Sequence, residues 1–100
     1  MYYAIVGEDI DHSLERRMAA RPAHIERLTQ LQNAGRLLTA GPFPAIDAAD
    51  PGPAGYSGSL IVAEFASLDE ARAWADQDPY LSAGVYRNVI VKPFRKVFPQ

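Results

Sequence analysis

Two stretches of this chain share one order of patterns, in which a strand-like apolar run precedes a helical stretch and a second strand-like run follows it. In the first stretch, Tyr2–Gly7 is rich in aromatic and β-branched residues, which favour strands. Ser13–Ala34 then has a helical period, and Gly35 stands where a left-handed C-terminal cap is usual. Arg36–Ala40 is a short second strand. Because Pro22 interrupts the helical stretch, either one helix bends there or a second helix begins with Pro22 in its first turn.

The second stretch begins with the clearest strand pattern in the chain. Ser59–Phe65 is almost entirely apolar. Ser67 follows it, and Glu70 comes three residues later, which is the spacing of a capping box that opens a helix. We expect this helix to continue through Ala75.

The end of the second stretch predicts a short helix and a last strand. Asp78 before Pro79 is typical of a helix start, with the aspartate as N-cap and the proline at the first helical position. Gly84 is expected to close that turn. Tyr86–Val91 is strand-like, and Pro93 predicts that the continuation of this strand through residue 98 lies at a sheet edge or a bulge.

A long connection separates the two stretches. Residues 41–58 hold four of the eight prolines and four of the seven glycines, which predicts a loop. Median connections are about 4 to 6 residues, so a loop of this length is either a binding lid or a mobile excursion. The complete order favours the α+β ferredoxin-like split β-α-β fold, with an antiparallel sheet and both helices on one face. We expect residues 1–100 to form a single domain of this class.

Composition and charge exclude several classes of protein. The chain has no cysteine, which excludes disulfides, thiolate nucleophiles and cysteine-bound zinc or iron–sulfur centres. The net charge is −2 and Lys and Arg form no block, which argues against nucleic acid as a partner. The N-terminal run has no basic segment and soon meets acidic residues, so it resembles neither a signal peptide nor a membrane span. We expect a cytoplasmic protein without a membrane partner.

Both faces of the predicted sheet are apolar. In the strand Ser59–Phe65, Leu60 and Val62 alternate with Ile61 and Ala63, so large apolar side chains point both ways. Helices on one side cover only one face, and a bare apolar face is unusual in a soluble monomer. We therefore expect a homodimer that packs sheet against sheet. The alternative is that the long loop folds under the sheet and covers this face.

His24 is the most informative polar residue. On a helical wheel it lies in line with Leu28 and Leu31, so it points toward the sheet or toward a cleft at the rim of the sheet. One imidazole nitrogen bonded to a carboxylate would leave the other as a base near neutral pH. Asp78 is the candidate carboxylate and Asp76 the alternative, although capping a helix is by itself a sufficient role for Asp78. From the residues alone, a core histidine without a chemical role fits this pattern more often.

Further polar residues suggest a ligand site beside the histidine. Arg21 and Arg17 extend its stripe toward the N-terminus, and guanidinium groups there predict an anionic, carboxylate-bearing ligand. Arg21 is the stronger candidate because it is nearer, and a solvated face with local ion pairs is the alternative. Ser59 offers a hydroxyl at the sheet edge but lacks the surroundings of a nucleophile. Tyr80, in the short helix after Asp78, is a fourth candidate for binding the ligand.

No metal site and no cofactor are predicted. His12 and His24 are twelve residues apart, and no cluster of His and Asp has the spacing of metal ligands. Residues 55–58 contain glycines but lack the lysine and the strand-to-helix context of a phosphate loop.

Several short motifs occur in a fixed order along the whole chain. They are Arg21-Pro-Ala-His24, Gly35-Arg-Leu-Leu-Thr-Ala-Gly-Pro42, Gly58-Ser59, Asp78-Pro79-Tyr80, Gly84-Val-Tyr86 and the final Val91-Lys-Pro-Phe-Arg-Lys-Val-Phe98. With these motifs the chain resembles the YciI-like (YCII-related domain) family. The resemblance implies a dimeric ferredoxin-like fold, similar to that of muconolactone isomerase and other dimeric α/β-barrel proteins. It also implies a site built on a histidine and an aspartate, which are His24 and Asp78 here.

The resemblance also implies a class of chemistry. One relative of this family acts as a dehydrochlorinase on chlorinated hydroxyhydroquinones and uses its His/Asp pair for acid–base chemistry. By analogy, we expect a cofactor-independent lyase or isomerase of small cyclic or carboxylated metabolites. His24 would remove a proton next to a carbonyl, and Asp78 would orient the imidazole. Arg21, Ser59 or backbone N–H groups near Gly58 would stabilise the oxyanion. The alternatives are a non-catalytic dimer that binds a small anion or a protein partner, and a structural or regulatory subunit.

Overall fold

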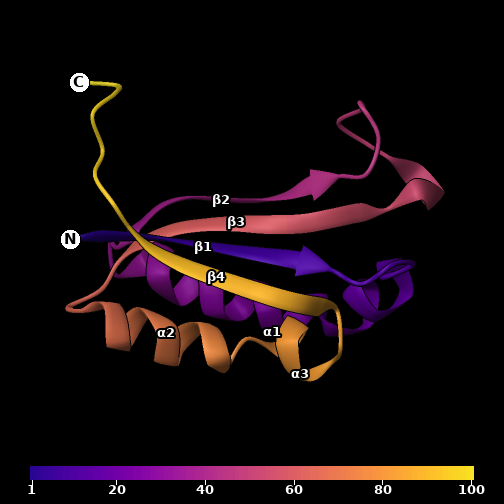
Figure 1. Cartoon of the computed structure of the whole chain (residues 1–100), viewed down its shortest axis with the longest axis horizontal. Coiled ribbons are helices and arrows are strands. Elements are labelled where there is room, and N and C mark those ends of the chain that lie inside the picture. Colours follow the sequence, from indigo (N-terminus) through magenta and orange to yellow (C-terminus); the bar gives the residue numbers. More distant parts are fainter.

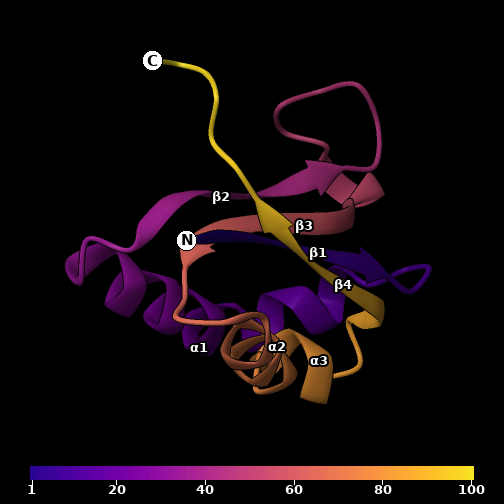
Figure 2. The same ribbon diagram turned by 60° about the vertical axis from the view of Figure 1, so that its left-hand side comes forward.

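One antiparallel sheet forms the centre of the computed structural model, which describes all residues from Met1 to Gln100 (Figure 1). Its strands lie in the order β2-β3-β1-β4, with bounds β1 Tyr2–Asp9, β2 Leu37–Pro44, β3 Tyr56–Glu64 and β4 Tyr86–Phe94. The helices all lie on one side of it (Figure 2), and they are α1 Leu14–Asn33, α2 Leu68–Asp76 and α3 Pro79–Ser82. A 3₁₀ helix, η1 Gly52–Ala54, precedes β3. The predicted α+β ferredoxin-like fold is therefore confirmed.

α1 is one continuous helix that passes through Pro22. Proline has no N–H to donate to the carbonyl group one turn earlier, that of Met18. Both residues are exposed, Met18 by 67%, so water can take the place of the missing donor. Gly35 follows the helix with φ of 69°, in the left-handed conformation that the sequence predicts for its C-terminal turn. None of the helices combines the length and the hydropathy that crossing a membrane requires.

The helix starts of the second stretch have the predicted capping bonds. The Ser67 hydroxyl accepts a hydrogen bond from the backbone N–H of Glu70 at 3.1 Å and opens α2. The Asp78 carboxylate accepts one from the backbone N–H of Tyr80 at 2.8 Å and opens α3, with Pro79 in the first turn. Both helices are therefore fixed by local side-chain chemistry.

The hairpin between β2 and β3 corrects two predicted boundaries. The sequence predicts that the strand ends at Ala40 and that residues 41–58 form a loop, but β2 continues to Pro44 and β3 begins at Tyr56. Pro42 pairs with Ser59, which is compatible with proline because β2 is an edge strand. The long connection is therefore confined to residues 45–55.

The ends of two other strands, β1 and β4, also differ from the prediction. β1 reaches Asp9, two residues beyond the predicted end at Gly7. β4 is an edge strand that contains Pro93, as predicted, but it ends at Phe94 and residues 95–100 do not continue it. In both views this last segment leads away from the sheet (Figures 1 and 2).

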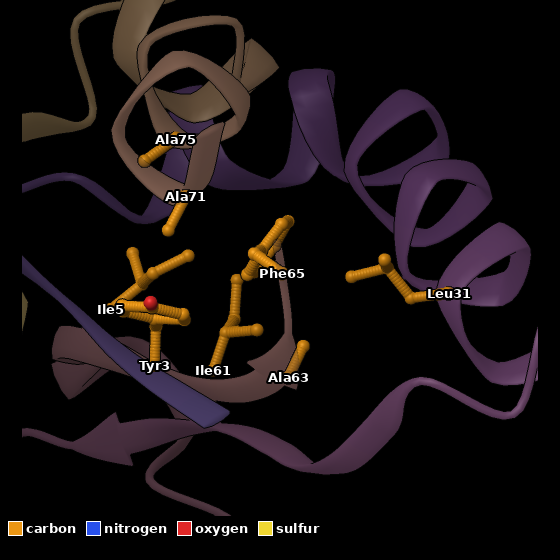
Figure 3. Packing of buried hydrophobic residues seen from close by; sticks show 8 residues of the cluster. All are labelled: Tyr3, Ile5, Leu31, Ile61, Ala63, Phe65, Ala71 and Ala75. Carbon is orange, nitrogen blue, oxygen red and sulfur yellow. The ribbon is translucent and has the colours of Figure 1, made fainter. Parts of the chain in front are cut away.

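The core lies between the sheet and the two longer helices (Figure 3). Side chains of alternate residues in β1 and β3 point toward the helices, because successive side chains in a strand point to opposite faces. The buried cluster consists of Tyr3, Ile5, Leu31, Ile61, Ala63, Phe65, Ala71 and Ala75. α2 contributes only alanines to this cluster, so its backbone lies close to the sheet.

A contact between Arg27 and Trp74 joins α1 to α2. The Arg27 guanidinium lies over the Trp74 ring, 4.1 Å from its centroid, and Arg27 Nη2 donates to the Trp74 carbonyl at 2.7 Å. Burial lowers the pKa of Arg27 from its usual value. α1, which carries several of the polar residues described next, is thereby fixed relative to α2.

Candidate functional site

α1 supplies three buried side chains at intervals of seven residues: Arg17, His24 and Leu31. Seven residues are about two turns of an α-helix, so all three lie on one face. Leu31 packs in the core, whereas Arg17 and His24 lie further along the same face and line a cavity. The prediction that His24 points toward the sheet is confirmed.

His24 and Asp78 are in direct contact. Nδ1 of His24 lies 3.0 Å from Oδ1 of Asp78, and the exposed fractions of the two side chains are only 9% and 3%. An ionised carboxylate only accepts hydrogen bonds, so Nδ1 carries the donated proton and Nε2 is the nitrogen with the free lone pair. Asp76, the alternative partner, is exposed to solvent.

The same Asp78 oxygen also caps α3. Oδ1 accepts the Tyr80 N–H at 2.8 Å as well as bonding to His24. The two roles considered for Asp78, helix cap and partner of the imidazole, are therefore compatible and share one atom.

Tyr80 fixes the plane of the imidazole. Its ring stacks on the His24 ring with centroids 3.9 Å apart and an angle of 10° between planes. The Arg17 guanidinium lies 4.9 Å from the centroid of the same tyrosine ring. Since residues 17 and 24 are about 10 Å apart along the helix, the ring fits between the two side chains. Burial raises the pKa of Tyr80, so its hydroxyl stays protonated at neutral pH.

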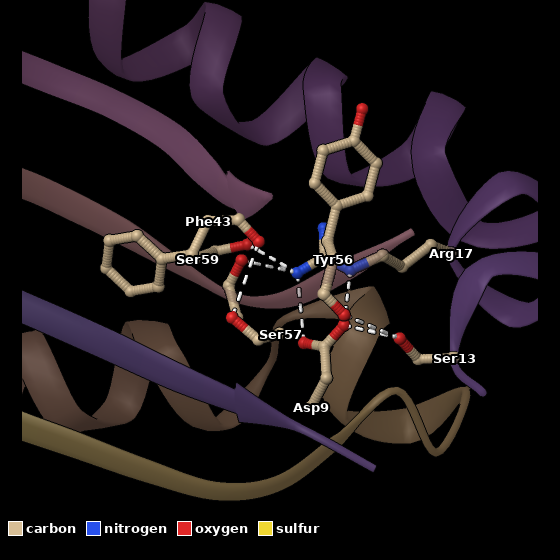
Figure 4. Close-up of polar contacts among 8 residues, drawn as sticks. Asp9, Ser13, Arg17, Phe43, Tyr56, Ser57 and Ser59 are labelled. Carbon is tan, nitrogen blue, oxygen red and sulfur yellow. Dashed lines mark hydrogen bonds and ion pairs between the residues drawn. The ribbon is translucent and has the colours of Figure 1, made fainter. Parts of the chain in front are cut away.

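Arg17 belongs to a buried polar network with Asp9 (Figure 4). Arg17 Nε donates to Asp9 at 2.6 Å, and Nη2 donates to the other carboxylate oxygen at 3.0 Å. Nη2 also contacts the Gly58 carbonyl at 2.9 Å and the Ser59 hydroxyl at 2.8 Å. Burial acts to lower the pKa of Arg17, but the hydrogen bond and charge of Asp9 outweigh it, and the net shift is upward. Arg17 therefore stays charged, with Asp9 as its counter-ion.

A cavity of about 520 Å³ lies beside this network, between α1, β2, β3 and the segment before β3. His24 and Ser59 contribute polar atoms to it, and Leu28 and Ile61 contribute apolar wall. Arg21 also lines the cavity, is exposed, and makes no ion pair or hydrogen bond within the protein. Arg21 is thus the cation with the most freedom to bind an anionic ligand. No group of three His, Asp or Glu side chains lies close enough together to hold a metal ion.

The comparison with family models decides the family. The model of the YCII-related domain matches residues 1–95. The chain belongs to the YCII-related domain family. The resemblance inferred from the motifs is therefore confirmed.

Curated members of the YCII-related domain family match nearly the full chain. Protein YciI of Escherichia coli O6:H1 and Protein YciI of Shigella flexneri are each 59% identical over 98 residues, which cover 98% of this chain and 100% of the relative. An uncharacterized protein of Haemophilus influenzae is 57% identical over the same coverage.

Two solved structures share this fold, and one of them is a small-molecule enzyme. The 5-chloro-2-hydroxyhydroquinone dehydrochlorinase of Burkholderia phenoliruptrix, in complex with 2,5-dihydroxybenzoquinone, superposes with a TM-score of 0.83 and 25% identity, covering 95% of this chain and 94% of the enzyme. A protein from Agrobacterium tumefaciens shares the fold, with a TM-score of 0.55 and 19% identity over 99% and 96% of the two chains. This chain therefore has a fold on which a small-molecule lyase is built.

The structure brings together all six side chains that the sequence singles out as candidates for a site. His24 and Asp78 bond to each other, and the cavity is lined by Arg17, Arg21, His24, Ser59 and Tyr80. The hydrogen bonds of Arg17 are directed mainly within the protein, which leaves Nη1 as its one nitrogen without a protein partner.

Sequence reasoning missed Asp9 and Tyr86. Asp9 is on the same face of β1 as Tyr3 and Ile5, so the alternation of the strand was the signal that it points inward. The Tyr86 ring lies over Gly7, where a Cβ atom would come within 2.5 Å of it, and only a glycine leaves that space. No local sequence pattern predicts this contact between Gly7 and Tyr86.

Proposed function

We propose that this protein is a cofactor-independent acid–base enzyme of the lyase or isomerase type, acting on a small anionic or cyclic metabolite. The observation that carries the proposal is the buried His24–Asp78 pair at the wall of a cavity. The similarity to a dehydrochlorinase, which is a lyase, supports the same class of reaction.

His24 acts as the base in this proposal. Its Nε2 has no hydrogen-bond partner within the protein and takes a proton from a carbon next to a carbonyl group of the substrate. The C–H electron pair then forms the C=C bond of an enolate, and the carbonyl oxygen carries the negative charge. In a lyase the enolate expels an anionic leaving group, and in an isomerase the imidazolium returns the proton to another carbon. Asp78 holds Nδ1–H and stabilises the imidazolium.

Three groups at the cavity bind the enolate oxygen or a carboxylate of the substrate. Arg21 supplies the uncommitted guanidinium, and Arg17 adds its Nη1. The Ser59 hydroxyl accepts a hydrogen bond from Arg17 and donates its own proton to the ligand. The Arg17 and Ser59 donors are held in place by the hydrogen bond between them, and donors fixed in this way stabilise charge as it develops.

Proton removal is the step to test, because it can be detected without knowing the complete reaction. The purified protein is incubated in D₂O with a panel of hydroxyquinones and unsaturated lactones, and exchange of carbon-bound hydrogen is followed by NMR. His24→Asn should lower the exchange rate by about 10² to 10⁴ and leave the circular dichroism spectrum unchanged. His12→Asn is the matched control, because His12 is exposed, and asparagine tolerates its positive φ of 56°.

Two results would contradict the proposal. If exchange in His24→Asn is as fast as in the wild type, the histidine does not take part in the chemistry. A compound that binds tightly and is recovered without exchange favours the alternative, a module that binds a small molecule without converting it.

We further propose that the functional unit is a homodimer that packs sheet against sheet, in the cytoplasm. The side of the sheet opposite the helices carries a row of apolar side chains from three neighbouring strands, Leu60, Val6 and Ile90. Ile90 is 36% exposed and Phe94 38% exposed on this chain, so the loop of residues 45–55 does not cover them. A second copy would remove this surface from water.

A further inference from the structure

A second cavity adjoins the candidate site. It has a volume of about 400 Å³ and lies between α1 and β2. Three residues, Ile25, Leu28 and Ala40, line both this cavity and the one that holds His24. Because they have these three residues in common, the two cavities lie next to each other along α1 and β2, and together they are called the groove.

Ala40, a residue with a small side chain, lies at the junction of the two cavities. Ala40 pairs with Ile61 in the sheet and faces α1, where the larger Leu28 and Ile25 form the opposite wall. A methyl group here takes up little of the space where the cavities meet, and a longer side chain at this position would extend into that space. Ala40 is thus the position from which a larger side chain would obstruct the junction of the two cavities.

The two ends of the groove differ in polarity. The end beside the site has the charged or titratable groups Arg17, Arg21, His24 and Asp50. The other end has none, and its polar side chains are the uncharged Thr29, Gln32 and Thr39 beside Leu37 and Leu38. A ligand that fits the whole groove is therefore charged at one end and uncharged and mainly apolar along the rest.

Exposed apolar side chains on α1 extend the groove wall to the surface. Met18 is 67% exposed and Ile25 is 38% exposed, and both line the cavity beside the site. Large apolar side chains gathered along one rim are typical of a surface that is covered when a ligand binds.

We propose that the site takes an elongated amphipathic anion, with an acidic head beside Arg21 and His24 and an apolar tail that passes Ala40 between α1 and β2. This inference rests on the proposed function and names the substrate class of that site. Such an elongated substrate differs from a compact ring, which would fill only the cavity that His24 lines.

Calorimetric titration with straight-chain monocarboxylates tests the inference. Acetate, butanoate, hexanoate, octanoate and decanoate are compared on the complete protein, below the concentration at which the longest acid forms micelles. Each added methylene group that enters the groove should tighten binding about 4-fold until the groove is filled. Heptylamine, with the same alkyl tail and the opposite charge, should bind at least tenfold more weakly than octanoate.

Ala40→Leu tests the route of the tail. The loss of affinity in this variant should grow with chain length and exceed tenfold for decanoate. Ala66→Leu is the matched control, because Ala66 is exposed and does not line either cavity, and it should keep the wild-type series.

The outcomes separate this inference from the proposed function. Affinity that is independent of chain length, or equally chain-dependent in wild type and Ala40→Leu, overturns the inference. If at the same time compact substrates still undergo exchange that depends on His24, the proposed function stands without it. If no acid of any length binds and no exchange occurs, both this inference and the proposed function are wrong.

Discussion

Asp78 joins the chemistry of the site to the stability of α3 through one oxygen atom. Its Oδ1 bonds to His24 Nδ1 and accepts the backbone N–H of Tyr80. Asparagine caps helices about as well as aspartate, but it carries no charge to stabilise an imidazolium. A change to asparagine therefore separates the two roles.

We expect Asp78→Asn to lower the rate of hydrogen exchange from the substrate by about 10² to 10⁴ and to change the free energy of unfolding by less than ~1 kcal/mol. Exchange is measured by NMR and stability by urea denaturation. Asp76→Asn, two residues earlier and exposed, is the control and should behave as wild type. An Asp78→Asn protein with the wild-type exchange rate would show that the carboxylate does not assist the base.

The sequence predicts much of the site at the level of single residues, because helical spacing is local information. His24 falls on the inward stripe of α1, and the Asp-Pro start of α3 marks Asp78. What the pattern could not show is that Asp9 lies against Arg17, since that bond depends on how β1 and α1 meet in space. The same holds for the stacking of Tyr80 on His24, which joins residues 56 positions apart.

At the scale of elements, the packing of β4 beside β1 depends on a glycine. A Cβ atom at Gly7 would lie 2.5 Å from the buried ring of Tyr86, which has no free space to move into. We expect Gly7→Ala to lower the free energy of unfolding by about 1 to 3 kcal/mol, because overpacking forces side chains from their preferred rotamers.

Gly41→Ala is the control for this measurement. A Cβ atom there would meet no atom within 4 Å, and its φ is not in the left-handed region, so its stability should stay within ~0.5 kcal/mol of wild type or rise. Urea denaturation midpoints compare the two variants. Equal midpoints would mean that the Tyr86 ring moves aside at little cost.

Helix ends were predicted better than strand ends, for a physical reason. A capping bond joins residues two or three positions apart, as Ser67 and Glu70 do, and is visible in the sequence. A strand continues for as long as a neighbour offers partners, so Pro42 and Pro44 belong to β2 because β3 lies beside them. The sequence shows the prolines, but it does not show that β3 lies beside them.

For the whole molecule, buried tyrosines predict a loss of stability in alkali. Burial raises the pKa of Tyr86 above its usual value of 10.0, and that of Tyr80 in the same direction. Below pH 10 both the folded and the unfolded chains keep these protons, so stability is unaffected. Above pH 10 the unfolded chain loses them first, so the free energy of unfolding falls as pH rises.

We expect Tyr86→Phe to show a smaller fall in the free energy of unfolding between pH 9 and pH 11 than wild type. The measurement is urea denaturation at a series of pH values. Tyr2→Phe, at a half-buried position on the opposite face of the sheet, serves as the control for removing one hydroxyl. An unchanged slope in Tyr86→Phe would contradict the prediction.

The proposed dimer is also a property of the whole molecule. We expect the 11.0 kDa chain to sediment as a particle of twice that mass at micromolar concentration, and Ile90→Glu to return it to the monomer mass. Glutamate at Ile90 would place a charge in the middle of the apolar row. Arg72→Glu, exposed on α2, is the matched control and should remain a dimer. A wild-type particle of 11.0 kDa would refute the dimer.

The seven-residue interval on α1 also limits how this chain can evolve. Arg17, His24 and Leu31 face the same way only while the helix between them keeps its length. Deleting one residue between positions 18 and 23 would rotate the rest of α1 by about 100°, because each residue turns the helix by that angle. Both His24 and Leu31 would then leave their places, so one event would remove the site and part of the core. This segment can accept substitutions much more readily than insertions or deletions.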